Sequence, residues 1–175
     1  MLSKLNVWVV IKDHRSTFVD ETSDGPQKSR SDDLVFFGLP LVGGIAFASY
    51  ASPLGESVVN IAMSVLALLT GLLLNLLVLT YGVLQGGKRS FENVDKVLID
   101  RRVRLLRYLY ANISFSILVS LADMLAYGAF LLGASWVFVV FAIRLVAGFL
   151  SSTLFLVLLL IIKRWHTLMS LEFER

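Results

Sequence analysis

The chain has 175 residues, of which 57% are hydrophobic and only 17% are Asp, Glu, Lys or Arg, with a formal net charge of +3. Typical soluble domains carry about 25% charged residues, and a soluble chain of this size needs a polar coat because it leaves about 30% of its area exposed. With a mean hydropathy of +0.77, the composition excludes an ordinary soluble domain. It predicts an all-α membrane protein whose outer surface faces lipid.

Residues 1–33 are expected to form a cytosolic N-terminal segment that is too short for a catalytic domain. Its apolar stretch is short and is followed by charges without a small-residue cleavage site, which excludes a signal peptide. The stretch KLNVWVVIK predicts either a segment lying at the membrane surface or one that pairs with a neighbouring subunit, and we favour the first. The stretch DETSDGPQKSRSDD has the composition of a disordered linker.

Four apolar runs follow, at residues 34–51, 58–84, 105–132 and 136–162. At ~1.5 Å per residue, each run is long enough as a helix to cross a hydrocarbon layer of ~30 Å. We therefore expect a transmembrane domain at residues 34–162, with four transmembrane helices in two antiparallel hairpins. A helical connector at residues 85–104 joins the hairpins, and residues 163–175 form a cytosolic tail.

Lysine and arginine residues are distributed unevenly between the connections. They precede the first run, fill the connector and follow the fourth run, whereas the connections SPLGES and LGAS contain none. Because cytosolic loops carry the excess of positive charge, both termini and the connector are expected in the cytosol, in a multi-pass protein of the cytoplasmic membrane. The connector is expected to extend the third helix into water. It also offers a basic surface for anionic lipids or a protein partner, formed by Lys88, Arg89, Arg101, Arg102, Arg104 and Arg107.

The sequence offers little chemistry for catalysis. It has no cysteine and only two histidines, His14 and His166, both outside the apolar runs, so neither a metal site nor a cofactor is expected. The runs lack the serine with histidine or lysine, or the paired aspartates, that intramembrane hydrolysis requires. The basic residues are not spread over a soluble face of the kind that binds nucleic acid. We therefore expect a non-enzymatic protein with no direct nucleic-acid partner.

Two charged residues, Asp123 and Arg144, stand inside the last two apolar runs. Either charge alone would cost about 2.5–3.5 kcal/mol at the centre of a bilayer on insertion scales. The two residues are equally distant along the chain from the middle of the LGAS turn, so an antiparallel hairpin places them at one depth. This symmetry predicts that Asp123 and Arg144 pair with each other.

Polar residues recur at helical spacing on three of the predicted spans. One face of the third span carries Asn112, Ser116, Ser120, Asp123 and Tyr127, and one face of the second carries Asn60, Ser64, Gly71 and Asn75. One face of the fourth carries Arg144, Gly148, Ser151 and Ser152. Two interpretations stay open. The polar faces either hold the helices together, or they form a hydrated path or gate that the pair Asp123 and Arg144 keeps closed.

Small residues stand four positions apart in the first and fourth runs, at Gly44 and Ala48, Ala147 and Ser151, and Gly148 and Ser152. This spacing lets membrane helices approach closely. The small-residue faces are more than one hairpin needs for its own packing. They predict that the chain forms a homo-oligomer.

The stretches IKDHRSTFVDETSDG, DDLVFFGLPLVGG, LLLNLLVLTYGVL and RLLRYLYANISFSILVSL resemble small four-span membrane subunits of bacterial antiphage defence systems. The resemblance covers most of the chain but rests on no catalytic or binding motif, so no residue role is carried over. It implies a membrane subunit that works beside a separate cytosolic protein. We therefore expect a membrane sensor, anchor or effector. A small ion channel or transporter is the alternative, and it ranks second because the spans lack the matched Gly or Pro breaks of transporters.

Overall fold

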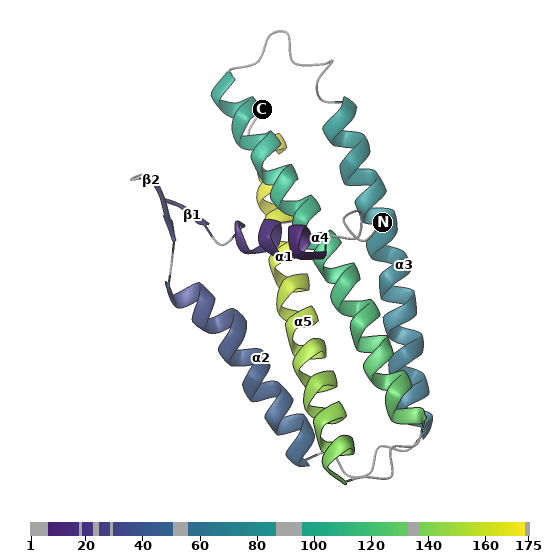
Figure 1. The fold of residues 1–175 in the computed structure, drawn as a ribbon. Helices are drawn as coiled ribbons and strands as arrows, with labels where there is room; N and C mark the ends of the chain where they lie inside the picture. The colour runs from purple at the N-terminus through teal and green to yellow at the C-terminus, as the bar shows by residue number, and fades with distance from the viewer. Residues whose placement is uncertain are drawn as a thin grey trace.

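The computed structural model of the chain describes residues 7–17, 19–22, 25–28, 30–50, 56–86, 96–132 and 137–173. Within these ranges the chain forms five helices, α1 (Val7–Arg15), α2 (Arg30–Tyr50), α3 (Glu56–Gly86), α4 (Lys96–Leu131) and α5 (Val137–Phe173) (Figure 1). Two short strands, β1 (Val19–Thr22) and β2 (Gly25–Lys28), lie between α1 and α2. The predicted helical architecture is confirmed.

Three of these helices are long and apolar enough to cross a membrane. Their apolar parts are Glu56–Gln85 of α3, Arg102–Leu131 of α4 and Phe138–Ser170 of α5, with mean hydropathies of 2.4, 1.7 and 2.7. Large apolar side chains cover their outer surfaces, as Leu68 and Phe138 show with exposed fractions of 69% and 87%. Extended apolar surfaces of this kind mark contact with lipid or protein, in agreement with the membrane character predicted from composition.

The first predicted span, at residues 34–51, corresponds to α2, whose described apolar part is shorter than those of the other three. Among the residues of α2 whose side chains the structure describes, the apolar part covers Val35–Ser49, and Arg30, Asp32 and Asp33 stand at the start of the helix. Pro40 lies inside α2, where a proline removes one backbone hydrogen bond and favours a kink. Length and composition thus establish three helices that can span a membrane, and a fourth span through α2 stays a prediction.

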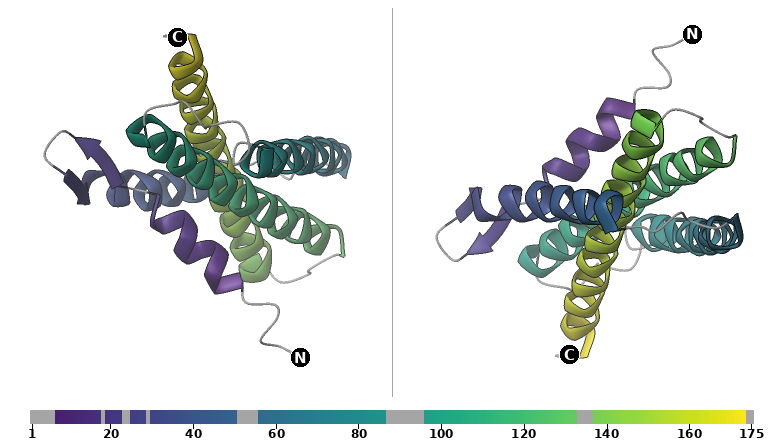
Figure 2. Two further views of the ribbon diagram at one scale, coloured as in Figure 1. Left: turned by 90° about the horizontal axis from the view of Figure 1, so that it is seen from above. Right: turned by 90° about the horizontal axis from the view of Figure 1, so that it is seen from below.

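The four long helices form an open row instead of a closed bundle. α4 and α5 pack together in the centre, α2 packs on α5 and α3 packs on α4, while α2 and α3 make no contact among the described residues. Views along the helices show α2 and α3 on opposite sides of the central pair (Figure 2). The second predicted hairpin, α4 with α5, is therefore a packed pair. The first is not, because its two helices flank the central pair from opposite sides.

Small residues account for the packing of α2 on α5. A Cβ on Gly148 of α5 would lie 3.0 Å from Gly44 Cα and 2.6 Å from Phe47 Cβ, so the two helices meet at the level of the backbone. A Cβ on Gly43 would collide with Ser152 Oγ. Small residues permit such an approach in lipid, where van der Waals packing drives helix association. The small-residue faces noted in the sequence therefore serve a contact inside one subunit.

The N-terminal segment contains more regular structure than its composition predicts. α1 packs across α4 near the middle of its length (Figure 1). The end of the row where α3 stops and α4 begins is here called the connector end. The stretch expected to be a linker contains β1 and β2, which pair antiparallel with Val19 opposite Lys28 and Thr22 opposite Gly25. Residues 20–22 and 25–28 of that stretch therefore have regular structure, and a linker role stays a prediction. β-branched Val19 and Thr22 favour extended backbone, a local preference that overall composition does not capture.

The connector is described only in its second half. α4 begins at Lys96, so this half continues the third span as one uninterrupted helix. Residues 87–95, which include Lys88 and Arg89, lie outside the described residues. α5 runs on to Phe173 and takes in most of the predicted cytosolic tail.

Candidate functional site

One face of α4 carries most of the intramembrane polar residues noted in the sequence. Asn112, Ser116, Ser120 and Asp123 each have an exposed fraction of 0%, and Tyr127 has 8%. These five residues are here called the α4 polar face. They receive hydrogen bonds or close contacts from α3, from α5 and from α1 with the two residues that follow it, here called the α1 region (residues 7–17). Helical periodicity places them on one side of α4, and the structure places that side inside the subunit.

Ser120 connects the α4 polar face with α3. Its Oγ lies 2.7 Å from Thr70 Oγ1, and the Thr70 hydroxyl also donates to the Leu66 carbonyl of its own helix at 2.7 Å. Hydrogen bonds between membrane helices contribute about 0.6 kcal/mol on average and up to about 1.7 kcal/mol. Thr70 belongs to none of the polar faces noted in the sequence.

Asp123 is hydrogen bonded to α5, but through Ser151 and not through Arg144. Ser151 Oγ donates to Asp123 Oδ2 at 2.7 Å. The Arg144 guanidinium lies over the Phe130 ring instead, with Cζ 5.7 Å from the ring centroid. The predicted ion pair is therefore not among the contacts that Asp123 makes with the described residues.

The register of α4 against α5 accounts for this difference. The prediction assumes that the two helices mirror each other about the middle of the LGAS turn, which sets Asp123 level with Arg144. Ser151 lies about two helical turns beyond Arg144 at ~3.6 residues per turn. The two helices cross at a clear angle (Figure 2), so the depth of a residue does not follow from counting positions from the turn.

Three buried polar atoms on the α4 polar face have no hydrogen-bond partner within the described residues. They are Asn112 Nδ2, Ser116 Oγ and Asp123 Oδ1. A buried polar group without a partner costs about 1–3 kcal/mol, and such groups are few in native structures. A succession of three along one helix face calls for a functional explanation.

The α1 region covers the Asn112 end of the α4 polar face. His14 Nδ1 lies 2.8 Å from Asn112 Oδ1, and the imidazole stacks on the Phe115 ring with 3.9 Å between centroids and 7° between planes. Thr17 Oγ1 donates to the same Asn112 oxygen at 3.1 Å. Arg164 Nη2 of α5 donates to the Thr17 carbonyl at 2.5 Å. One buried cluster therefore fixes the α1 region to both central helices.

Burial lowers the pKa of His14 from 6.5 to about 4, against a smaller raising effect of the Asn112 hydrogen bond, and the charge of Arg164 adds to the lowering. The imidazole is therefore neutral at pH 7. Because Asn112 Oδ1 is an acceptor, Nδ1 carries the proton and donates it. From the sequence, His14 belongs to a solvated flank, since its neighbours Asp13 and Arg15 are charged.

The polar stripe of α3 faces away from the other helices. Asn60, Ser64, Gly71 and Asn75, here called the α3 outer face, are all exposed. The Ser64 hydroxyl donates to the Asn60 carbonyl of its own helix at 2.8 Å. Apart from the backbone around Gly71 itself, no atom of the described residues lies within 4 Å of the position that a Cβ on Gly71 would take. Asn75, predicted as part of an intramembrane polar site, does not join the α4 polar face.

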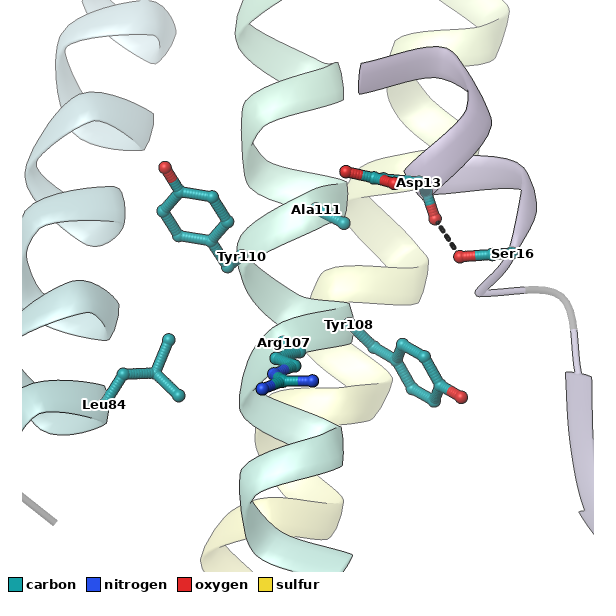
Figure 3. Close-up of a pocket in the computed structure, with 7 residues that line it drawn as sticks. All are labelled: Asp13, Ser16, Leu84, Arg107, Tyr108, Tyr110 and Ala111. Carbon is teal, nitrogen blue, oxygen red and sulfur yellow. Dashed lines mark hydrogen bonds between the residues drawn. The ribbon is translucent and has the colours of Figure 1, made fainter. Parts of the chain in front are cut away.

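The basic residues predicted to form a cytosolic surface are described in part. Arg102 is half-buried, whereas Arg104 and Arg107 are exposed. The side chain of Arg101 lies outside the described part of the chain, as do Lys88 and Arg89. Arg107 borders a cavity of about 370 Å³ between the α1 region, α3 and α4, which is also lined by Asp13, Ser16, Leu84, Tyr108, Tyr110 and Ala111 (Figure 3).

Comparison with known proteins assigns no family to the chain. Neither a protein-family model, nor a curated protein, nor a solved structure matches it. Among the residues that the structure describes, no three His, Asp or Glu side chains gather as a metal ion would require. Function is therefore inferred from the helices and their polar faces.

Proposed function

We propose that the chain is a non-enzymatic integral membrane subunit that assembles with copies of itself and serves as a membrane sensor, anchor or effector for a cytosolic protein. The observation that carries this proposal is the α3 outer face. It presents two asparagines and a serine on the exposed side of a helix that is apolar enough to span a membrane. Among the described helices α3 packs on α4 alone, so in a single copy this face meets lipid.

Hydrocarbon is a poor environment for asparagine side chains. A polar amide moved from water into an apolar medium without a partner costs roughly 2–7 kcal/mol. The carboxamide carries two N–H donors and an acceptor oxygen, so Asn60 and Asn75 can be satisfied by the same residues of a second copy. Gly71 stands between them and leaves open space in which two helices can approach closely. The α3 outer face is therefore complementary to itself.

The connector end supplies the basic surface of a cytosolic face. Exposed Arg104 and Arg107 lie there, which favours an orientation with this end and both termini in the cytosol. α2 has 21 residues and at ~1.5 Å per residue is about as long as the hydrocarbon layer is thick. We infer that it completes four spans in the cytoplasmic membrane. The resemblance to membrane subunits of antiphage defence systems supports a separate cytosolic partner as the source of any catalytic activity.

A small ion channel or transporter is the second candidate, and one observation favours it. The buried atoms Asn112 Nδ2, Ser116 Oγ and Asp123 Oδ1 without partners follow one face of α4, and water molecules satisfy groups of this kind in polar, roomy sites. A hydrated line that opens at both ends would conduct protons or small cations. Ion flux into proteoliposomes that is abolished by Ser116→Leu would favour this candidate over a sensor or anchor.

Cross-linking in the native membrane tests the assembly. The chain has no cysteine, so Gly71→Cys introduces a single thiol, which forms a disulfide on mild oxidation if two copies meet there. Val65→Cys is the matched control, because Val65 is exposed on the same helix but points about 120° away from Gly71 around the helix axis. We expect a dimer of the 19.4 kDa chain for Gly71→Cys and none for Val65→Cys. Equal cross-linking at both positions, or none at Gly71, would reject assembly through the α3 outer face.

A further inference from the structure

The cavity at the connector end has no part in the proposed assembly. Asp13 and Ser16 reach it from the α1 region and Leu84 from α3, whereas α4 contributes Arg107, Tyr108, Tyr110 and Ala111 (Figure 3). Its volume of about 370 Å³ falls within the range of ~300–1,000 Å³ that is usual for small-molecule sites. Asp13, Arg107 and Tyr110 are exposed, so a ligand can reach the cavity from the surface.

The cavity lies at the depth of a lipid headgroup. About 36 Å of helix separates Arg107 from Leu131, the last residue of α4, at ~1.5 Å per residue. The hydrocarbon core of a bilayer is ~30 Å thick. Followed back from Leu131, α4 therefore crosses the whole core shortly before it reaches Arg107. Tyr108 and Tyr110 agree with this depth, because tyrosine is enriched where membrane and water meet.

The cavity presents one positive and one negative side chain to the same occupant. The planar guanidinium of Arg107 matches the geometry of phosphate oxygens. The Asp13 carboxylate is an acceptor of hydrogen bonds, and Ser16 Oγ, which donates to the Asp13 carbonyl at 2.7 Å, keeps its lone pairs for a further donor. Leu84 adds an apolar wall beside the charged groups. An occupant with a phosphate, a nearby N–H donor and an apolar part fits all of these residues.

We propose that this cavity binds the headgroup of a phospholipid that carries both a phosphate and a primary ammonium, the chemistry of phosphatidylethanolamine. Arg107 binds the phosphate, and Asp13 with Ser16 accepts hydrogen bonds from the ammonium. The proposal rests on the proposed function in one respect, since it requires this end of the chain to lie at a membrane surface. The predicted basic surface attracts anionic lipids in general, whereas this cavity is proposed to bind one defined headgroup.

Other phosphate-bearing ligands satisfy only part of this arrangement. Inorganic phosphate and phosphatidylglycerol bring a phosphate for Arg107 but no ammonium for Asp13. Phosphatidylcholine carries a quaternary ammonium without N–H groups, so it cannot donate to Asp13 or Ser16. A primary ammonium on a phosphate ester satisfies both charged residues of the cavity.

Native mass spectrometry of the full chain in mild detergent tests the headgroup assignment. The protein is equilibrated with phosphatidylethanolamine, phosphatidylcholine and phosphatidylglycerol of identical acyl chains, and the fraction that retains each lipid is measured. We expect phosphatidylethanolamine to be retained about tenfold better than phosphatidylcholine, the ratio that one charge-assisted hydrogen bond supplies. Arg107→Gln should lower the retention of phosphatidylethanolamine about tenfold. Asp13→Asn should remove its advantage over phosphatidylcholine and leave phosphatidylcholine retention unchanged.

Arg104→Gln is the matched control, because Arg104 is exposed on the same helix and is not among the residues that line the cavity. It should leave the retention of all three lipids unchanged. The substituted side chains are exposed in the folded chain, and Asp13→Asn, on a different helix from Arg107, tests the site independently if Arg107→Gln does not fold. Thermal unfolding verifies each variant.

Three results would overturn the headgroup site. The first is equal retention of the three lipids. The second is a preference for phosphatidylglycerol that Arg104→Gln and Arg107→Gln weaken alike, as expected of a general basic surface. The third is displacement of phosphatidylethanolamine by millimolar inorganic phosphate, which would indicate a site for free phosphate. The same spectra give the mass of the protein assembly, so a failure of the lipid assignment is distinguished from a failure of the proposed self-assembly.

Discussion

The hydrogen bond from Ser151 to Asp123 predicts how the two central helices respond to substitution. Ser151→Ala removes the hydroxyl that donates to Asp123 Oδ2. The carboxylate of Asp123 is fully buried, and its other oxygen, Oδ1, already has no hydrogen-bond partner among the described residues. Hydrogen bonds to charged groups contribute about 1.5–3 kcal/mol in soluble proteins, whereas those between membrane helices reach about 1.7 kcal/mol. We therefore expect Ser151→Ala to lower the free energy of unfolding by about 1.5 kcal/mol, near the top of the membrane range.

A double-mutant cycle separates Ser151 from Arg144 as the partner of Asp123. Free energies of unfolding in detergent for Ser151→Ala, Asp123→Ala and their combination should give a coupling energy of about 1 kcal/mol. The matched cycle with Arg144→Gln should give less than about 0.5 kcal/mol, the usual limit of additivity for residues without a shared contact. Strong coupling to Arg144 with none to Ser151 would refute the observed register of α4 against α5 and favour the ion pair.

Other contacts predict measurable changes as well. Gly148→Leu should lower the free energy of unfolding by about 1–3 kcal/mol or more, because any side chain there meets α2. The mass of the oligomer should not change. Dissociation of the oligomer would place this contact between subunits. Burial lowers the pKa of His14 from 6.5 to about 4, so on acidification the unfolded chain binds a proton before the folded chain does. The free energy of unfolding therefore falls between pH 6.5 and pH 4, by at most about 3 kcal/mol. Hydrogen exchange of α1 should increase over this window, and an exchange rate that is independent of pH after correction for intrinsic chemistry would contradict the buried neutral imidazole. Fusion reporters should read cytosolic at Gly87 and external at Gly55, and a cytosolic reading at Gly55 would exclude four spans.

The sequence predicts which helix faces are polar better than it predicts which neighbours those faces meet. The spacing from Asn112 to Tyr127 places five polar residues on one side of α4, and that side is buried because polar groups in lipid need partners. Periodicity contains no information on the crossing angle of two helices or on their offset along the axis. Asp123 therefore meets Ser151, although Arg144 is the charge at the matching distance from the turn.

The same limit applies to the outer helices and to α1. Gly44 and Gly148 indicate close helix packing from their sequence spacing, but spacing does not tell a contact within one chain from a contact between two chains. In the structure they bring α2 onto α5, and the α3 outer face is the surface that we propose meets a second copy. His14 has no recognisable signal, because its partner Asn112 is 98 residues away in the chain.

The most direct test of self-assembly through the α3 outer face is the mass of the intact protein in lipid nanodiscs, compared between the unmodified chain and Gly71→Leu. Leucine at this position extends into the space beside Gly71, where an added Cβ meets no described atom within 4 Å apart from its own stretch of helix. Assembly through this face predicts a multiple of 19.4 kDa for the unmodified chain and 19.4 kDa for the variant. A single-chain mass at every protein-to-lipid ratio, or an oligomer that survives both Gly71→Leu and Asn75→Leu, would contradict it.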